Sequence, residues 1–381
     1  MGVGALTHVD PIPGGGALTE FRLEEPVLMA HAGTLGDHLS FLGTLNLEGL
    51  TMPTGVLTLG AWGEGFDDRR HPHTYAHELI VSIEQGFGSV AHPVRVSVSA
   101  GKGFVPFGSE DPMNRPALAF PVNHHWSQIL ERAVTMLGLR AGPVTVEAAL
   151  FNGDEPERPG QWPLISRFGD SWSTRVTLTP TAGFDLEGSR AFVKSPENRL
   201  GAGTNQEKWH ASARFERAVP RGRLYALAEW ARTTEADGLF QFRSGLGEAA
   251  WSVGRSRVYY RFERTDRPEE ERLLDPFRSL RPHLENSILG VTRWSVHTAG
   301  YGFHFEMVRR RLGVDPLLEG AYARVTDVGT GLFDAQSFYG RRDLWSLTLA
   351  VRLSTGMMHR MGHYGISGEG RGDHMEHMHA S

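Results

Sequence analysis

The segment from Leu344 to Ser354 alternates between two kinds of side chain along its whole length. Its odd-numbered positions carry Trp, Leu and Val, and the even-numbered positions from 346 onward carry Ser, Thr, Ala and Arg. An alternation with a period of two predicts an extended strand with one apolar and one polar face. The pattern returns through most of the chain, which predicts a sheet that closes on itself with its apolar face toward lipid. We therefore expect an all-β fold, a closed antiparallel transmembrane β-barrel.

The alternating segments predict about 16 strands, with 18 as the upper count. The predicted strands include Val56–Phe66, and also Ser287–His297 and Tyr301–Arg310 on either side of a turn at 298–300. Short connections alternate with long ones, as the turns and loops of outer-membrane barrels do. Three regions result: a loose N-terminal segment (1–37), in which Leu18–Met29 is the one candidate short strand, the barrel (38–356) and a His/Met-rich C-terminal tail (357–381).

Composition narrows the classes of compartment and partner. The chain has 381 residues and no cysteine, as suits a protein exported through an oxidising periplasm. Its formal net charge of −5 and the lack of a basic run argue against nucleic acid and leave outer-membrane lipid as the expected partner. Residues 1–36 contain no basic segment followed by an apolar run. Location in the outer membrane therefore predicts a signal peptide that is missing from this sequence.

Two stretches of the first half resemble the phosphate-selective porin O/P family. They are SVSAGKGFVPFG (97–108) and VTVEAALFNGDEP (144–156), separated by a long loop and the strand ILERAVTMLGLRAG. The matching residues are Lys102, Pro106, Phe107, Gly108, Phe151, Asn152 and Gly153. The resemblance covers about 60 residues and implies a 16-stranded, often trimeric channel of the outer membrane that passes anions. The chain differs from that family in having few lysines and in ending on a tail rather than on an aromatic residue.

Basic residues on the polar face of the strands are the candidates for lining a pore. Alternation assigns to that face Arg95, Arg175, Arg214, Arg257, Arg261, Arg293 and Arg352, and the family resemblance adds Lys102. Guanidinium groups in a narrow lumen favour anions over cations, because the low-dielectric wall focuses their field. Alternatively, these groups pair with lumen carboxylates, for which Glu48, Glu147, Glu216 and Glu263 are the candidates. Both interpretations place them inside the barrel.

The C-terminal tail is rich in potential metal ligands. The candidates are His359, Met361, His363, His374, Met375, His377, Met378 and His379. Thioether and imidazole groups together suit copper, so a copper ion at the tail is the one cofactor we expect, although no cofactor is required. The alternative is a polar extension that binds nothing.

Histidines also cluster in the loop before residue 78. His71, His73 and His77 lie close together in the sequence, and with His92 and the His124-His125 pair they suggest a second metal site. Packing of these histidines within the loops is the alternative interpretation.

The sequence favours a channel over an enzyme. It contains no nucleophile elbow, no His-Glu-x-x-His motif and no phosphate-binding loop. The leading hypothesis is a passive outer-membrane channel for small anionic or polar solutes, with residues 105–128 or 154–171 folding inward as the constriction. A copper-binding or copper-resistance barrel is the alternative, and a closed barrel that conducts nothing is the third. The resemblance leaves a homotrimer open.

Overall fold

The computed structural model describes residues 1–34, 38–52, 55–61, 73–89, 92–109, 111–270, 288–307, 312–356 and 361–368, and within them 18 strands form one antiparallel sheet. The strands are β1 (Gly2–Asp10), β2 (Leu18–Glu24), β3 (Val27–Thr34), β4 (Leu39–Asn46), β5 (Ala76–Ser89), β6 (His92–Gly103), β7 (Arg132–Ala141), β8 (Val144–Phe151), β9 (Ser171–Thr181), β10 (Phe184–Val193), β11 (Gln206–Val219), β12 (Gly222–Glu235), β13 (Phe240–Val253), β14 (Ser256–Glu270), β15 (Ile288–Phe303), β16 (Phe305–Met307), β17 (Leu312–Val328) and β18 (Asp343–Ser354).

The helices are short and lie in the connections. They are α1 (Glu48–Thr51), η1 (Leu59–Ala61), η2 (Pro112–Asn114), α2 (His124–Ser127), η3 (Ile165–Arg167), η4 (Ala236–Gly238), α3 (Ala335–Tyr339) and η5 (Gly365–Ser367). Among the described residues, no helix is long and apolar enough to span a membrane.

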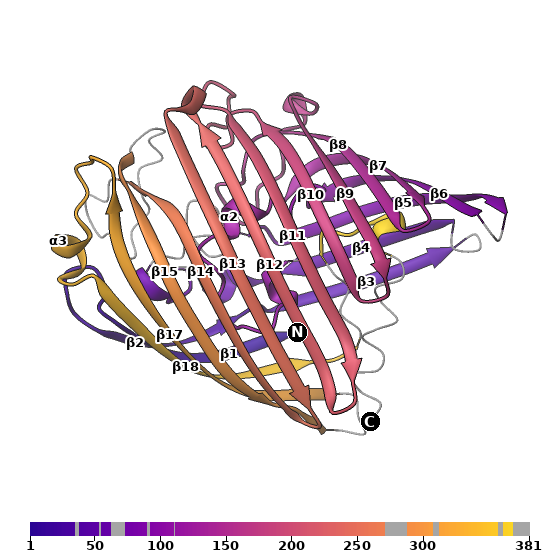
Figure 1. Cartoon of the computed structure of the whole chain (residues 1–381). Helices are drawn as coiled ribbons and strands as arrows, with labels where there is room; N and C mark the ends of the chain where they lie inside the picture. Colours follow the sequence, from indigo (N-terminus) through magenta and orange to yellow (C-terminus); the bar gives the residue numbers. More distant parts are fainter. Residues whose placement is uncertain are drawn as a thin grey trace.

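Neighbouring strands pair around the wall of a barrel (Figure 1). Pairing runs from β3 through successive antiparallel neighbours to β18, whose far edge pairs with β1. Leu349 of β18, for example, lies opposite Leu318 of β17 on one side and opposite Leu6 of β1 on the other. A sheet whose last strand pairs with its first leaves little unpaired edge.

The ring of strands closes through residues 18–34. β2 pairs with β1, and β3, which follows after only Glu25 and Pro26, pairs with β4. At the junction Val27 and Met1 exchange backbone hydrogen bonds of 2.8 and 2.9 Å. If β2 with β3, and β15 with β16 across His304, each count as one bent strand, the 18 strands become 16. The predicted fold class is confirmed.

The apolar face of the strands lies on the outside of the barrel. Trp345 and Val351 of β18 are 41% and 42% exposed, whereas Leu344 and Ala350 on the other face are buried. The outer face of many other strands is similar, and its exposed residues include Leu6, Phe21, Val81, Ile83, Val98, Leu137, Val146, Val176, Leu186, Trp230, Trp251, Val258, Tyr260 and Leu318. So much exposed apolar surface is typical of a barrel that faces lipid.

The prediction of a loose segment over residues 1–37 is wrong. β1, β2 and β3 all fall within it, and Val3, Ala5 and Val9 are buried on the inner face of the wall. The alternation is weak there because Gly and Ala take positions that larger side chains hold elsewhere. The barrel therefore begins at the first residues of the chain rather than at residue 38.

Two predicted strands are also wrong. Residues 56–58 of the predicted strand Val56–Phe66 are not in a strand, 59–61 form η1, and 62–66 lie outside the described residues. The predicted turn at 298–300 lies instead within β15, where Gly300 is paired with Tyr259 of β14. A Cβ atom at Gly300 would lie 2.1 Å from Cζ of Tyr259. The glycine makes room for an aromatic ring and does not form a turn.

We expect Gly300→Ala to destabilise the folded barrel by roughly 1–3 kcal/mol, the usual cost of overpacking, because the Tyr259 ring must move. Gly247→Ala is the matched control, since a Cβ atom at Gly247 meets no atom within 4 Å. The loss of the compact band on gel electrophoresis with rising temperature measures the effect. Equal melting of the two variants would contradict this account of Gly300.

Candidate functional site

Most of the predicted pore-lining arginines on the inner wall are paired with carboxylates. Arg95 contacts Glu84 at 2.6 Å, Arg175 contacts Glu147 at 2.7 Å, and Arg261 lies 3.5 Å from Glu248. Arg214 contacts Glu216, which is one of the predicted lumen carboxylates. For these four arginines the structure shows the pairing interpretation, in which much of the guanidinium charge is neutralised locally.

Arg257 and Arg352 differ from the other inner-wall arginines. Neither guanidinium group makes a hydrogen bond or an ion pair with any described residue, and the two lie close enough for their charges to repel. Asp315 lies opposite Arg352 in the β17–β18 ladder, but its carboxylate contacts Nδ1 of His304 at 2.6 Å. These two arginines are therefore the predicted pore-lining groups whose positive charge is least neutralised.

Arg293 and Lys102 do not line the lumen as predicted. Arg293 lies on the outer face of β15, paired with Asp266 at 2.6 Å, while its neighbour Trp294 is buried inside. The alternation predicts Arg293 on the inner face of this strand, but it is Trp294 that faces inward, where it packs against Tyr339 of α3. Lys102 is buried at the end of β6, where its ammonium group donates to Glu131 at 3.1 Å.

Residues 104–131, between β6 and β7, cross the interior of the barrel. Ser109, Arg115 and Asn123 from this segment all donate to the carboxylate of Glu229 on β12, at 2.6, 3.0 and 2.6 Å. The side chains of Arg115 and Glu229 are fully buried. Figure 1 shows α2, which belongs to this segment, within the ring of strands. We name residues 104–131 the constriction loop.

A second carboxylate holds the constriction loop at a different part of the wall. Glu319 of β17 accepts the backbone N–H groups of Leu118 and Ala119 at 2.7 and 2.9 Å, and the hydroxyl of Tyr259 at 2.8 Å. The loop also receives a hydrogen bond from Arg261 of β14, which donates to the Ala119 carbonyl at 2.6 Å. The loop therefore spans the lumen and is fastened to the wall on several strands.

The other predicted constriction, residues 154–171, stays at the rim. Its Arg167 donates to the carbonyls of Ser195 and Asn198 in the next connection, at 3.2 and 3.0 Å. Of the two candidates, the loop over 105–128 is the one that folds inward.

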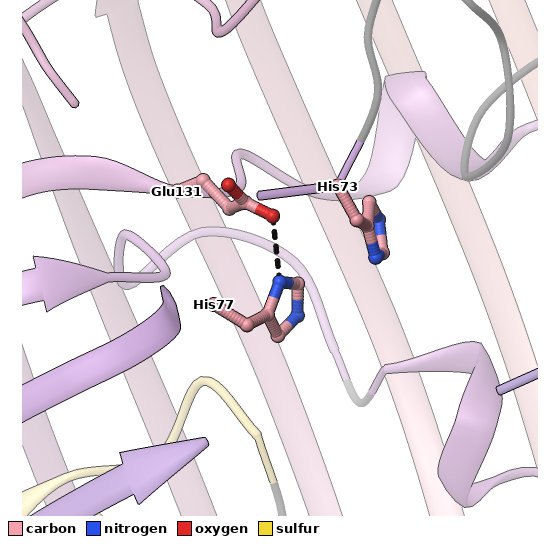
Figure 2. A group of neighbouring side chains, drawn as sticks. All are labelled: His73, His77 and Glu131. Carbon is pink, nitrogen blue, oxygen red and sulfur yellow. Dashed lines mark hydrogen bonds and ion pairs between the residues drawn. The ribbon is translucent and has the colours of Figure 1, made fainter. Parts of the chain in front are cut away.

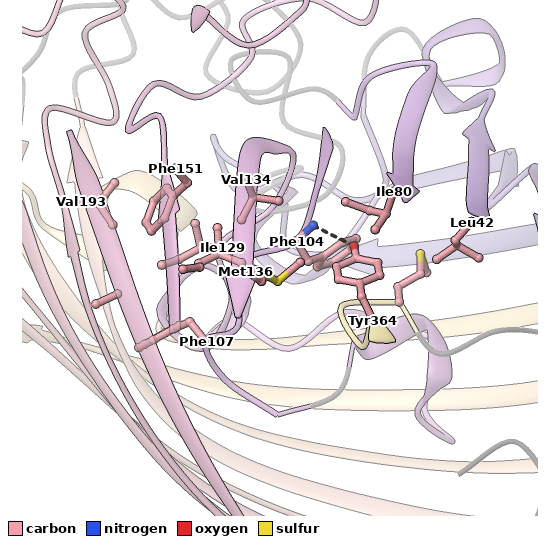
Figure 3. Packing of buried hydrophobic residues seen from close by; sticks show 14 of the residues in the cluster. Leu42, Ile80, Phe104, Phe107, Ile129, Val134, Met136, Phe151, Val193 and Tyr364 are labelled. Atoms are coloured by element: carbon pink, nitrogen blue, oxygen red, sulfur yellow. Dashed lines mark hydrogen bonds between the residues drawn. The ribbon is translucent and has the colours of Figure 1, made fainter. Parts of the chain in front are cut away.

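The C-terminal segment 361–368 returns into the barrel after β18. The hydroxyl of Tyr364 donates to Glu78 at 2.5 Å and accepts the backbone N–H of Phe104 at 2.9 Å, as Figure 3 shows for Phe104. The N–H of Ile366 donates to Ser97 at 3.3 Å. Arg175, predicted to line the pore, is covered by this segment and donates to the Gly362 carbonyl at 3.3 Å. We name residues 361–368 the C-terminal strap.

The strap packs into the main apolar cluster of the interior. Met361 and Tyr364 join Phe104, Phe107 and Ile129 of the constriction loop there, along with buried residues of the wall (Figure 3). Gly138 of β7 leaves space for the strap, since a Cβ atom there would lie 2.9 Å from Ile366. The constriction loop and the strap therefore support each other on one side of the lumen.

Two predicted copper ligands, Met361 and His363, belong to this strap. Met361 is buried in the apolar cluster, and Nδ1 of His363 lies 3.3 Å from a guanidinium nitrogen of Arg175. His359, His374, Met375, His377, Met378 and His379 lie outside the described residues. The copper site of the tail stays a prediction.

A different group of ligand types comes together at the rim that carries the long connections. His73, His77 and Glu131 are all buried, and one ligand atom of each lies within 4.8 Å of the others. Nδ1 of His77 contacts Oε1 of Glu131 at 2.6 Å, and the two imidazoles stack with ring centres 4.6 Å apart (Figure 2). A small cavity of about 40 Å³, lined by His73, His124 and Glu131 among others, adjoins the group.

Electrostatics keep His73 and Glu131 in forms suited to a ligand. At His77 burial acts to lower the pKa, but Glu131 outweighs it and raises that pKa, so this imidazole must release a proton to bind an ion. Burial, together with the nearby charges of His77 and His124, holds the pKa of His73 well below its usual value, so this imidazole is neutral. Burial works to raise the pKa of Glu131, but Lys102 and His77 outweigh it and hold that pKa below its usual value. The group thus contains a neutral imidazole beside a carboxylate.

The residues that sequence reasoning missed are the wall carboxylates that anchor the loop. Glu229 and Glu319 were not among the predicted lumen carboxylates, although each sits on the polar face of its strand. Glu263, which was predicted, accepts backbone hydrogen bonds from Val122 and Asn123 of the constriction loop rather than pairing only with an arginine. Alternation could have placed all three inside, but nothing local indicates that the loop is their partner.

Solved structures match this chain, whereas no protein-family model and no curated protein does. The chain is similar to the anion-selective porin from Comamonas acidovorans, with a TM-score of 0.51 and 12% identity over 93% of this chain and 99% of that one. It is also similar to OmpF from Salmonella typhi, with a TM-score of 0.50 and 11% identity over 92% and 95% of the two chains. The chain therefore has the fold of an outer-membrane porin.

We expect Glu229→Ala to release the constriction loop, because it leaves Arg115 buried without its carboxylate, a change that costs about 3–5 kcal/mol. Faster amide hydrogen exchange over residues 109–123 measures the release. Glu207→Ala is the control, because Glu207 is more than half exposed and its ion pair with Arg190 is long, at 3.8 Å. Unchanged exchange in the Glu229 variant would show that Glu229 does not anchor the loop.

Proposed function

We propose that this chain is an outer-membrane channel through which small anionic or polar solutes diffuse passively. The observation that carries the proposal is the constriction loop, which crosses a barrel of porin fold and is fastened to Glu229 and Glu319 on different strands. A loop held across a lumen narrows the passage without closing the wall. The apolar outer surface favours lipid as the surroundings of that wall.

The preference for anions rests on Arg257 and Arg352. Because most other inner arginines are paired with carboxylates, the field along the lumen depends mainly on the few cations that are not. The similar porin from Comamonas acidovorans is described as anion-selective, which supports the same preference here. The finer resemblance to phosphate-selective porins, and assembly as a homotrimer, stay predictions.

The C-terminal strap is part of the proposed constriction. It covers Arg175 and fills space beside the constriction loop, so it reduces the cross-section on the side of β5 to β9. Among the described residues, no contact favours the copper-binding alternative, since Met361 and His363 are engaged with the barrel itself. We propose a channel rather than an enzyme.

Replacing both Arg257 and Arg352 with glutamine is expected to lower the anion-to-cation permeability ratio several-fold, because it removes the least neutralised charges of the lumen. Reversal potentials across a planar lipid bilayer under a KCl gradient measure the ratio. Arg243→Gln is the control, since Arg243 is exposed and its guanidinium group donates to Gln241. A folded wild-type protein that passes no current would overturn the channel itself, whereas unchanged selectivity would overturn only the role of these arginines.

Removing residues 357–381 is expected to increase the single-channel conductance, because the strap no longer occupies the lumen. Tyr364→Ala in the full-length chain should act in the same direction by breaking the contacts with Glu78 and Phe104. Conductance steps in a planar bilayer provide the measurement. If both variants conduct as the wild type does, the strap does not restrict the passage.

A further inference from the structure

We infer that His73, His77 and Glu131 form a binding site for a divalent transition-metal ion of the zinc class at the rim of the barrel. Two imidazoles and one carboxylate are a ligand set that zinc uses in proteins, and three protein ligands leave a fourth position for water or another donor. The inference does not depend on the proposed channel function, because it concerns the rim rather than the passage.

The three ligands come from segments that the fold brings together. His73 precedes β5, His77 lies in that strand where the pairing with β4 shifts register, and Glu131 is the last residue before β7. Their side chains are at most 5% exposed. Ligand bonds of roughly 2.0–2.2 Å place the donors of a tetrahedral site about 3.3–3.6 Å apart. The longest separation, up to 4.8 Å, therefore needs to shorten by roughly 1.2–1.5 Å. The contact of 2.6 Å between Nδ1 of His77 and Glu131 needs to lengthen by roughly 0.7–1 Å. Side-chain rotations can supply both changes.

The backbone at Glu131 provides independent support. Its φ of 55° lies in the left-handed region, which costs a residue with a side chain on the order of 1 kcal/mol. The strain persists because the Glu131 carboxylate accepts hydrogen bonds from the Thr74 N–H, at 2.9 and 3.1 Å, and from His77. The chain thus holds a strained residue so that its carboxylate meets the histidine segment. Strain of this kind concentrates at functional sites.

The outer contacts are those that metal-bound histidines use. Nδ1 of His73 lies 3.3 Å from Glu48, a carboxylate that can accept its N–H and orient the ring. The ion would take the place of the proton that His77 and Glu131 now share. That proton then moves to Nε2 of His77 or leaves to solvent, so charge and proton count balance.

Lys102 provides a sharp test, because its ammonium group lies 3.1 Å from Oε2 of Glu131 and opposes a second cation. It holds the carboxylate in place while the site contains no metal. If the site binds zinc, Lys102→Met should tighten binding several-fold, since the competing charge is gone and all three ligands remain. In a network that serves only to pack the loop, the same variant gains no affinity for metal.

Zinc binding to the full-length, detergent-folded protein is measured by calorimetry, with cobalt absorption as a readout of tetrahedral coordination. We expect His73→Ala and Glu131→Gln each to weaken one zinc-binding event roughly 100-fold. Loss of a residue that only orients a metal ligand can already weaken binding by that factor, so loss of a ligand itself should do at least as much. His8→Ala is the control, because His8 bonds Thr19 on the outer face. Binding by the tail histidines would persist in all of these variants and is thereby separated from the site.

Two results would overturn the inference. One is the same number and affinity of bound zinc ions in the wild type, His73→Ala and Glu131→Gln. The other is a Lys102→Met variant that folds but binds zinc no more tightly than the wild type. Compact migration on unheated gels establishes that each variant is folded.

Discussion

The structure depends on the continuous backbone pairing around the wall, and that pairing requires the strict alternation of side chains. Away from a few bulges, such as the one where β4 pairs with β5, each strand keeps its register and so presents apolar side chains outward and polar ones inward. At residues 18–34 the barrel closes through a bend between β2 and β3 instead of an extra turn, because β2 pairs with β1 and β3 pairs with β4. Much of the inner surface that results is polar, so segments that enter it are held by hydrogen bonds as well as by the apolar cluster.

The interior is held by carboxylates that satisfy backbone groups. Glu319 accepts two adjacent N–H groups of the constriction loop, and Glu78 accepts the Tyr364 hydroxyl of the C-terminal strap. Buried carboxylates are costly unless charge-assisted hydrogen bonds compensate for the lost water. Because the loop supplies those donors, the wall and the loop stabilise each other. This mutual dependence fixes the position of a segment that has almost no regular secondary structure.

The sequence was sufficient for the wall but not for what fills it. Alternation identifies β18 and most of β5 to β14 because it is a local property of each strand. It fails at β1, where Gly4 and Ala5 weaken the pattern, and at Arg293, where Trp294 turns inward to meet α3. The count of 16 agrees with the structure although two of its predicted members were wrong, because β1 and the bent strand β2–β3, which that count left out, offset them.

The contacts of the constriction loop could not be read from the sequence because its partners are distant. Ser109 and Glu229 are separated by 120 positions, and Phe104 and Tyr364 by 260. No periodicity links such residues, and only the closed ring brings them together. His73 and Glu131 are likewise 58 positions apart in the sequence. They meet only because the fold brings together the strand ends beside which they lie.

The abundance of arginine in the sequence overstates the positive field of the lumen. Arg175 and Arg261 are each bound to a carboxylate and to backbone carbonyls, so their charge stabilises the wall and the internal segments. A guanidinium whose hydrogen bonds are already made inside the protein attracts a passing anion less strongly than an unpaired one. Selectivity in such a barrel therefore follows from the imbalance between cations and carboxylates at a few positions. Arg257 and Arg352, which repel each other on neighbouring parts of the inner wall, are where that imbalance is largest among the predicted pore residues.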